Sequence, residues 1–300
     1  MDGAPFRPLG NELGLSPSQT YARVIEELHQ LPHNTILTQT YCDRWSGILN
    51  VDGKYIKIKG FKQKIPFIWC VDFLQHDFPV GLLAPTESVN AFSELFETLL
   101  ACNYPLRIVI SDDVAPLKIA LKRYYPSAKL QLCHVHYIEN IRQQLHIRTQ
   151  DTYHHFFNSL LTHVFADPLT RNEREAGLLH VLEQRTNQHP LLQSIIVAIA
   201  TRFDDLFAYT LIKGCPKTNN LIECFNSHLN GRLKTVKGFQ SFDSAQRFLN
   251  AYLIRRRTKP FTDCTGQFKM FNGFIPLQNS IKRNIPFPNI LGFQAPETER

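Results

Sequence analysis

The order of β-rich and helical segments between residues 48 and 133 is the feature that most constrains the fold. Three apolar runs joined by short turns predict strands. Two segments with helical spacing of apolar residues follow, and each precedes another short apolar run. The pattern β-β-β-α-β-α-β is typical of an α/β protein, with a mixed sheet and helices on its faces. The seven segments are Ile48–Lys59, Pro66–Phe73, Val80–Ala84, Ser88–Cys102, Leu106–Ser111, Pro116–Tyr124 and Lys129–Cys133.

The pattern changes after His136, where no further strand is expected. Apolar spacing in this part predicts a series of helices. From Phe261 onward, prolines at 276, 286, 288 and 296 favour a tail that is irregular or that wraps the surface. The expected helices are Ile138–Gln150, Thr152–Phe165, Arg171–Asn187, Leu191–Thr210, Asn219–Leu233 and Ser241–Arg257.

One amphipathic helix is expected ahead of the first strand. Ser16 is a good N-cap, and Gly14 stands where a tight turn between two helices would lie, so Glu12–Glu27 resembles the second half of a helix-turn-helix. Pro5 and Pro8 predict that the helix before this turn is broken. A single packed helix is therefore an equal alternative. In the helix-turn-helix interpretation, the residues that would face DNA are Gln19, Thr20 and Arg23.

Positive charge is concentrated in two stretches. The chain has 33 Lys and Arg against 26 Asp and Glu, a formal charge of +7. Between Leu229 and Lys259, Asp243 is the only acid. Such a local excess suits neutralisation of phosphates, whereas solvated helix faces usually mix both signs, so nucleic acid is the favoured partner. The basic residues are Arg232, Lys234, Lys237, Arg247, Arg255, Arg256, Arg257 and Lys259 in this stretch, and Lys54, Lys57, Lys59, Lys62 and Lys64 in the other.

Composition excludes several classes of protein. The longest apolar run, Ile195–Ala200, is far shorter than the roughly 20 residues of a membrane helix. The first residues do not form a signal peptide, and seven cysteines without a C-x-x-C pair favour reduced thiols. We therefore expect an intracellular protein that does not associate with a membrane. Enzymes that depend on a Walker A, G-x-S-x-G or H-E-x-x-H motif have no support.

Three acids stand in settings that suit catalysis. Asp52 lies inside the first expected strand before a glycine, Asp112 directly follows the strand ending at Ser111, and Glu223 lies on a helix with an apolar face. Carboxylates brought together repel one another unless a divalent cation neutralises them, so their natural use is to bind Mg²⁺. Taken singly, each has an ordinary alternative: a strand-edge or turn Asp, a helix cap formed by Asp112 or Asp113, and a solvated helical Glu.

Four segments carry a family resemblance: RWSGILNVDGKYIKIKG, VISDDVAPLKIAL, LQLCHVHYIENI and TNNLIECFNSHLNGRLKTVKGFQSF. They resemble the DDE transposases, in particular the RNase H-like catalytic domain of Mutator-like elements and related prokaryotic insertion-sequence transposases. The resemblance implies that Asp52, Asp112 and Glu223 are the catalytic, metal-binding acids, and that Cys133 and His136 are the family's C-x-x-H pair. We expect this pair to pack beside the acids; a metal site is the less favoured alternative, because two further ligands are not evident.

The resemblance also implies a division of the chain. Residues 1–44 would be an N-terminal helical segment, 45–137 and 216–260 the RNase H-like core, 138–215 an all-helical insertion before the last catalytic helix, and 261–300 an irregular tail.

The activity implied by the resemblance is DNA transposition. Two ions of Mg²⁺, or Mn²⁺, per active site would support cleavage of a phosphodiester at the transposon end and transfer of the freed strand into target DNA. The partners would be double-stranded DNA and further copies of the chain on paired ends, and the protein would be located with the DNA, in a nucleoid or a nucleus. The residues expected to contact the phosphate backbone of the DNA are Lys54, Arg232, Lys234 and Lys237.

One departure from the family pattern favours an alternative. Only about 45 residues precede the expected core, fewer than such transposases usually place there. The alternative is a truncated or domesticated DNA-binding protein derived from a transposase, and a nuclease of the RNase H fold is a third, weaker option. Because a DNA-binding protein does not need the three acids, their presence favours the enzyme.

Overall fold

The computed structural model of the chain describes residues 6–183, 189–236, 238–288 and 290. It divides into two compact units. The first comprises Met1–Arg107, Ala115–Ala128 and Asn220–Arg300, and the second comprises Ile108–Val114 and Lys129–Asn219. Each unit is described by itself below.

The three strands of the first unit form the antiparallel meander that the sequence predicts. They are β1 (Ile48–Ile56), β2 (Ile65–Asp72) and β3 (Gly81–Leu83). β2 lies between the other two, and its register pairs Trp69 with Asp52 of β1. Every residue of β2 is buried, so this strand needs apolar side chains on both faces rather than an alternating pattern.

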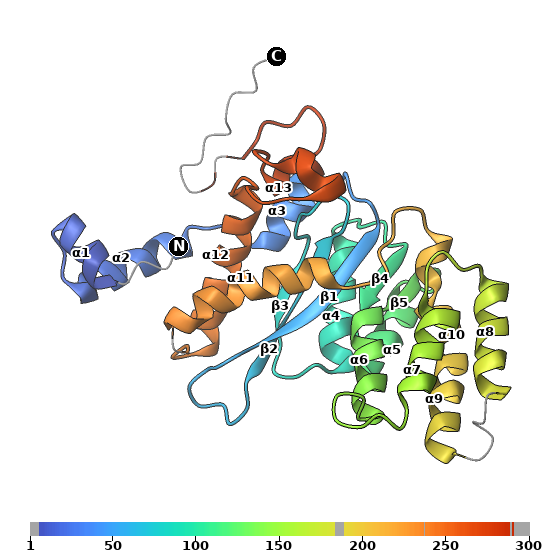
Figure 1. Cartoon of the computed structure of the whole chain (residues 1–300). Helices are drawn as coiled ribbons and strands as arrows, with labels where there is room; N and C mark the ends of the chain where they lie inside the picture. Colours follow the sequence, from blue (N-terminus) through green and yellow to red (C-terminus); the bar gives the residue numbers. More distant parts are fainter. Residues whose placement is uncertain (1–5, 184–188, 237, 289, 291–300) are drawn as a thin grey trace. The chain divides into compact units, whose positions relative to one another are not determined.

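Two helices pack on this meander from the C-terminal part of the chain, α11 (Asn220–Val236) and α12 (Phe242–Thr258). α11 crosses β1 and β2, as Figure 1 shows. The core beneath these helices is aromatic, with the ring of Trp69 stacked on Phe78 at 5.2 Å. Burying each large apolar side chain contributes about 1.5–3 kcal/mol, so this layer holds the helices on the sheet. The helices contribute Ile222, Phe225, Leu229, Leu249, Tyr252 and Leu253 to it.

The other helices expected in the first unit form close to their predicted positions. Ser88 caps α4 (Val89–Ala101), and α4 packs on α5 (Ala115–Tyr124). Ser241 caps α12, as the predicted start at this residue requires.

The N-terminal helices differ from expectation. The helix predicted to be broken is α1 (Phe6–Leu13), which forms because Pro8 lies in its first turn, where a helix needs no N–H donor. Gly14 follows with φ +66°, and α2 (Pro17–His29) begins after the capping residue Ser16. A further helix, α3 (Asn34–Tyr41), is absent from the sequence-based prediction.

The tail is only partly irregular. It contains a 3-10 helix, η4 (Gly266–Phe271), and a short helix, α13 (Pro276–Ser280). Ile275 and Leu277 are fully buried, which anchors this segment to the unit. The prediction of an irregular tail is therefore wrong for this stretch, because apolar residues between the prolines find a place in the core.

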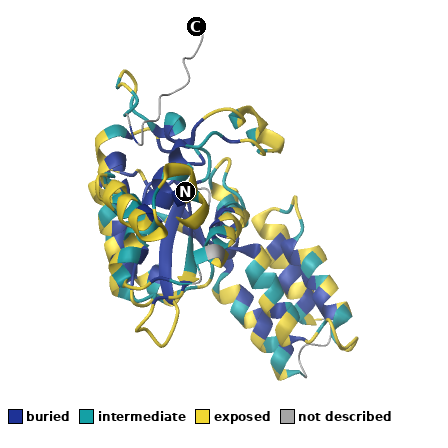
Figure 2. Cartoon of the chain, turned by 90° about the vertical axis from the view of Figure 1, so that its left-hand side faces the viewer, coloured by how far each residue is buried: buried dark blue, intermediate teal, exposed yellow. Residues whose placement is uncertain are grey.

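The second unit pairs β4 (Ile108–Ser111) with β5 (Lys129–Leu132) in parallel. The rest of this unit is helical, as predicted, and Figure 2 shows buried residues along one side of its helices. The helix expected over Leu191–Thr210 is interrupted at Arg202, and the predicted end of the preceding helix at Asn187 lies outside the described residues. The helices are α6 (His134–Gln144), α7 (His154–Leu160), the π-helix η1 (Leu161–Phe165), α8 (Arg171–Glu183), α9 (Pro190–Thr201), α10 (Phe203–Leu206) and the 3-10 helix η3 (Ala208–Leu211).

The described part of the chain is thus mixed α/β, with three antiparallel and two parallel strands among many helices. None of its helices is both long and apolar enough to span a bilayer. All seven cysteines lie in described parts of the chain and are free thiols, as the sequence predicts.

Candidate functional site

Asp52 is fixed in place by two hydrogen bonds within the first unit. The backbone N–H of Gly53 donates to Oδ1 at 2.7 Å, and Nδ2 of Asn226 donates to Oδ2 at 2.5 Å. The side chain is half-buried on β1. Because both oxygens accept a hydrogen bond from the protein, the carboxylate has a defined orientation.

Asn226 connects Asp52 to the aromatic core. The indole Nε1–H of Trp69 donates to Oδ1 of Asn226 at 2.9 Å. An indole nitrogen can only donate, so it holds the amide oxygen and leaves the amide NH₂ to face the carboxylate. No motif in the sequence singles out Asn226, although its position one turn after Glu223 is a signal that could have identified it.

Glu223 lies in the first turn of α11, half-buried. Residues three apart share a helix face, so Glu223 lies on the side of α11 that carries Asn226 toward β1. The positive end of the helix dipole stabilises a carboxylate in this turn by about 0.3–1 kcal/mol. The first unit therefore brings two of the three predicted acids to neighbouring positions, Asp52 on the sheet and Glu223 on the helix that crosses it.

A further carboxylate lies against β1 at Gly53, on the face of the strand opposite to Asp52. A Cβ at position 53 would collide with the carboxylate of Glu87, so the glycine leaves space for that side chain. Burial and a hydrogen bond to Glu87 raise the pKa of Tyr55 to about 12. No motif in the sequence pointed to Glu87, because it lies in a loop before α4 and only the fold brings it to β1.

In the second unit, Asp112 and His136 form a pair. Oδ1 of Asp112 and Nδ1 of His136 are 2.6 Å apart. Asp112 directly follows β4, and His136 lies in the first turn of α6, which directly follows β5. Parallel strands end at the same edge, which is why residues after β4 and β5 meet. Burial raises the pKa of Asp112, and the neighbouring His136 opposes that shift.

Cys133 completes a cluster with this pair. Its thiol is buried and accepts a hydrogen bond from the backbone N–H of Asn219 at 3.3 Å. Burial raises the pKa of the thiol. The ligand atoms of Asp112, Cys133 and His136 lie within 4.8 Å of one another, which suits a metal ion. A thiol and an imidazole suit Zn²⁺ better than Mg²⁺, so the cluster as a whole does not fit the ion that the sequence predicts, whereas the Asp112 carboxylate alone does.

The three residues of α2 that are predicted to face DNA differ in exposure: Thr20 is buried, whereas Gln19 and Arg23 are exposed. Thr20 is only 1% exposed, and its hydroxyl donates to the carbonyl of Ser16. Gln19 accepts from the backbone N–H of Ser16. Thr20 is therefore unavailable to a base, because α1 packs against it, and the prediction for this residue is wrong. Arg23 is exposed and pairs with two acids of its own helix.

The residues predicted to contact the DNA backbone belong to the first unit. Lys54 is two residues from Asp52 on β1, so the two side chains share a face of the strand. Arg232 and Lys234 lie on α11, while Lys237 lies outside the described residues.

Comparison with known proteins identifies the family. Residues 81–259, more than half of the chain, match the family described as transposase, Mutator family. This chain belongs to the Mutator family of transposases. It is 25% identical over 173 residues to the transposase for insertion sequence element IS256 in transposon Tn4001 of Staphylococcus aureus, which is 56% of this chain and 43% of that protein. It is 22% identical over 172 residues to the transposase for insertion sequence element IS1201 of Lactobacillus helveticus, covering 56% and 44%. The matches thus span less than half the length of these transposases.

The match to the Mutator transposases covers the whole second unit and part of the first. It includes Asp112, the Cys133–His136 pair and Glu223, whereas Asp52 precedes it. The prediction of a transposase from the sequence is confirmed. The catalytic assignment of the three acids stays a prediction, and so does the role of the C-x-x-H pair.

Proposed function

We propose that this Mutator-family chain catalyses cleavage of a phosphodiester at transposon ends and transfer of the freed strand into target DNA. The observation that carries the proposal is the hydrogen bond from Asn226 to Asp52, because it ties the first predicted acid to the helix that carries the last one. The catalytic acids would be Asp52, Asp112 and Glu223 on an RNase H-like core.

The donor chemistry of the acids fits Mg²⁺. Carboxylate oxygens are the ligands that this hard cation prefers, and Mn²⁺ accepts the same set. Asp52, Asp112 and Glu223 would hold two such ions. When bound, the ions would lower the pKa of an attacking water and polarise the phosphate.

The chain's own residues have distinct parts in this chemistry. Asn226 holds the Asp52 carboxylate in one orientation, so its free lone pairs point in a fixed direction. His136 holds Asp112 in the same way from α6, and we assign the C-x-x-H pair to this support rather than to a metal of its own. Lys54, beside Asp52 on β1, would contact a substrate phosphate.

The partners follow from the proposed reaction. The substrate would be double-stranded DNA, both the transposon ends and the target, and the protein would act where that DNA is located. Joining two ends to one target requires at least two active sites, so we propose a homo-oligomer on paired ends.

A strand-joining assay tests the proposal. Protein, Mg²⁺ or Mn²⁺, a target plasmid and pre-cleaved duplexes from the inverted repeats flanking the gene are combined. Asp52→Asn and Glu223→Gln are expected to give no joined product, because each removes a carboxylate oxygen while preserving side-chain shape. Glu94→Gln, an exposed acid on α4, is the matched control and should join normally.

Three other outcomes of this assay would contradict the proposed function. Joining that survives Asp52→Asn or Glu223→Gln would contradict the catalytic assignment. A wild-type protein that binds the duplex tightly but joins nothing would support a DNA-binding derivative. Hydrolysis without joining would support a nuclease.

A further inference from the structure

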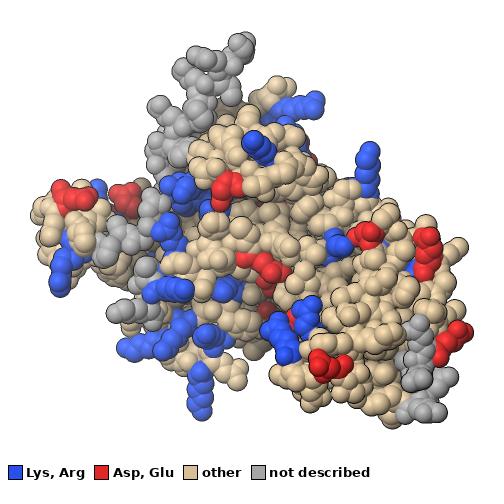
Figure 3. Space-filling model, viewed as in Figure 1, with Lys and Arg blue, Asp and Glu red and all other residues tan. Residues whose placement is uncertain are grey.

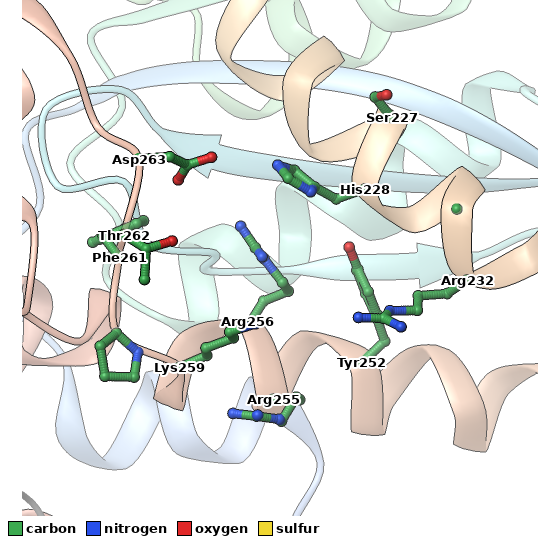
Figure 4. Close-up of a pocket in the computed structure, with 12 residues that line it drawn as sticks. Ser227, His228, Arg232, Tyr252, Arg255, Arg256, Lys259, Phe261, Thr262 and Asp263 are labelled. Carbon is green, nitrogen blue, oxygen red and sulfur yellow. The ribbon is translucent and has the colours of Figure 1, made fainter. Parts of the chain in front are cut away.

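A basic pocket lies between α11 and the C-terminal half of α12 in the first unit (Figure 4). Its volume is about 420 Å³, and it is closed on one side by the segment that follows α12. It is separate from the acids described above, none of which lines it. The residues that matter for its chemistry are His228, Arg232, Tyr252, Arg255, Arg256 and Lys259.

The pocket concentrates positive charge from two helices. Arg232 comes from α11, and Arg255, Arg256 and Lys259 come from the end of α12, while Asp263 is the single acid in the lining. Cations in the last turn of a helix complement its dipole, which accounts for the α12 residues alone. It does not account for Arg232 from the other helix. Like charges around one cavity repel one another, so the arrangement favours an anion between them.

Arg256 is held in position rather than left to move in solvent. Its guanidinium lies over the ring of Phe225, 4.9 Å from the centroid. Its Nε is buried and has no hydrogen-bond acceptor within the described residues. A fixed guanidinium with an unused N–H is prepared for a bidentate acceptor such as a phosphate.

Tyr252 gives an independent indication of a ligand. The residue is 6% exposed, and its buried hydroxyl has no hydrogen-bond partner in the part of the chain that the structure describes. Figure 4 shows the hydroxyl pointing away from α12 toward α11, on the side of His228. A buried hydroxyl without a partner is costly, and a phenylalanine would avoid that cost. A tyrosine at this position is explained if a ligand accepts its hydrogen bond.

We propose that this pocket binds a phosphate group of a DNA backbone, with Arg256, Arg232 and Tyr252 donating to its oxygens. This rests on the proposed function only in that DNA is the substrate. Lys and Arg side chains gather over α11 and α12 on the surface of the unit (Figure 3), so a backbone that enters the pocket meets further cations outside it. Phosphate contacts position a duplex but carry no base information, so the site contributes affinity without sequence preference.

Two variants test the pocket in equilibrium binding. Fluorescence anisotropy measures association with a labelled duplex of arbitrary sequence, in EDTA so that no cleavage occurs. Tyr252→Phe keeps charge and shape and is expected to weaken binding about 3- to 10-fold through one lost hydrogen bond. Arg256→Gln is expected to weaken it about 10-fold or more and to reduce the slope of log K against log salt by about one.

A control variant distinguishes binding in the pocket from binding by the surrounding surface charge. Arg247→Gln removes a charge from the same helix outside the pocket, where Arg247 pairs with Asp243. Losses as large for Arg247→Gln as for Arg256→Gln, with Tyr252→Phe unchanged, would overturn the proposal in favour of diffuse surface charge. Thermal melting of each variant confirms the fold, and Tyr252→Phe remains informative if Arg256→Gln unfolds.

A second experiment distinguishes a phosphate of the DNA backbone from the phosphate of a small molecule. Calorimetry with inorganic phosphate and with a nucleoside monophosphate measures free phosphate binding. If Tyr252→Phe abolishes binding of these compounds but leaves duplex affinity unchanged, the ligand is a small molecule and the DNA assignment is wrong. Asp52→Asn should bind DNA like the wild type, so a failure of the joining chemistry and a failure of the pocket give different results.

Discussion

At the scale of single residues, the orientation of Asp52 depends on Asn226 and Trp69. The amide of Asn226 has one acceptor and two donors, and the indole N–H uses the acceptor. The bond from Trp69 therefore fixes which end of the amide faces Asp52, and that end is the NH₂ group. One substitution at position 226 should disturb both the carboxylate and the indole.

Under the proposed function, Asn226→Ala is expected to lower the rate of strand joining about 10- to 100-fold, which is the usual effect of removing a residue that orients a metal-binding carboxylate. The free energy of unfolding should fall by about 1–3 kcal/mol, because the buried indole N–H of Trp69 loses its acceptor. Single-turnover joining and urea denaturation measure the two effects. Asn230→Ala on the same helix is the control, and an Asn226→Ala protein that joins at the wild-type rate would contradict the positioning role.

At the scale of elements, a buried ion pair joins three helices of the first unit. Arg257 of α12 and Asp77 are both fully buried, with their charged atoms 2.6 Å apart. Arg257 also donates to Asn34 and Thr38 of α3, and Ser280 of α13 donates to Asp77. The sequence placed Arg257 in a phosphate-binding stretch. That interpretation is wrong for this residue, because its side chain points into the core, where the charge of Asp77 balances it.

Arg257→Met is expected to lower the free energy of unfolding by about 3–5 kcal/mol, because it leaves the Asp77 carboxylate buried without its partner. The double variant Arg257→Met with Asp77→Leu should recover much of that loss, since neither charge is then buried. Urea denaturation of both proteins provides the measurement. A double variant less stable than the single one would show that the hydrogen bonds to α3 and α13, rather than the charges, dominate.

Within the second unit, Asp167 ties α8, η3 and the segment before α11 together. It accepts hydrogen bonds from Arg174 at 2.9 Å, Tyr209 at 2.6 Å and Lys217 at 2.5 Å. Partial burial alone would raise the pKa of Asp167, but hydrogen bonds from Lys217, Tyr209 and Arg174 outweigh it and lower the pKa to about 2.

This shift predicts a pH-dependent difference between the wild type and Asp167→Asn. A carboxyl group with a depressed pKa in the folded state stabilises the fold above its unfolded pKa of about 4 and loses that effect as the pH falls through the folded value. The wild type should therefore melt at a higher temperature than Asp167→Asn at pH 7, and the two should converge between about pH 4 and pH 2. Melting curves at several pH values measure the difference; a gap that stays constant down to pH 2 would mean that the charge of Asp167 is not responsible.

The elements also show what the sequence can and cannot predict. Strands and helices between residues 48 and 133 form close to their predicted positions, because apolar spacing and caps such as Ser88 are local signals. α1 was missed because a proline in the first turn resembles a helix breaker. Asn226 and Glu87 were missed because their roles depend on contacts between distant segments, and the burial of Arg257 was missed for the same reason.

At the scale of the whole molecule, the excess of positive charge would determine how the protein binds the DNA that we propose as its substrate. Its formal charge is +7, and the loop from β1 to β2 presents Lys57, Lys59, Lys62 and Lys64 as exposed side chains. This loop pairs with Phe239 between α11 and α12, so it extends the basic surface of those helices. Counterions released from DNA phosphates provide much of the affinity of such a surface.

Association with duplex DNA of arbitrary sequence is therefore expected to weaken by about 10³-fold between 50 and 200 mM salt, as for a protein that contacts about six phosphates. Lys62→Gln with Lys64→Gln should reduce the slope of log K against log salt by about two, because two contacts are lost. Asp52→Asn should leave the slope unchanged, since the Asp52 side chain is proposed to act in catalysis and does not neutralise a phosphate. Fluorescence anisotropy across a salt series measures all three proteins. An affinity that does not change with salt would mean that the lysines of this loop are solvated surface residues, and that DNA is held by contacts other than its phosphates.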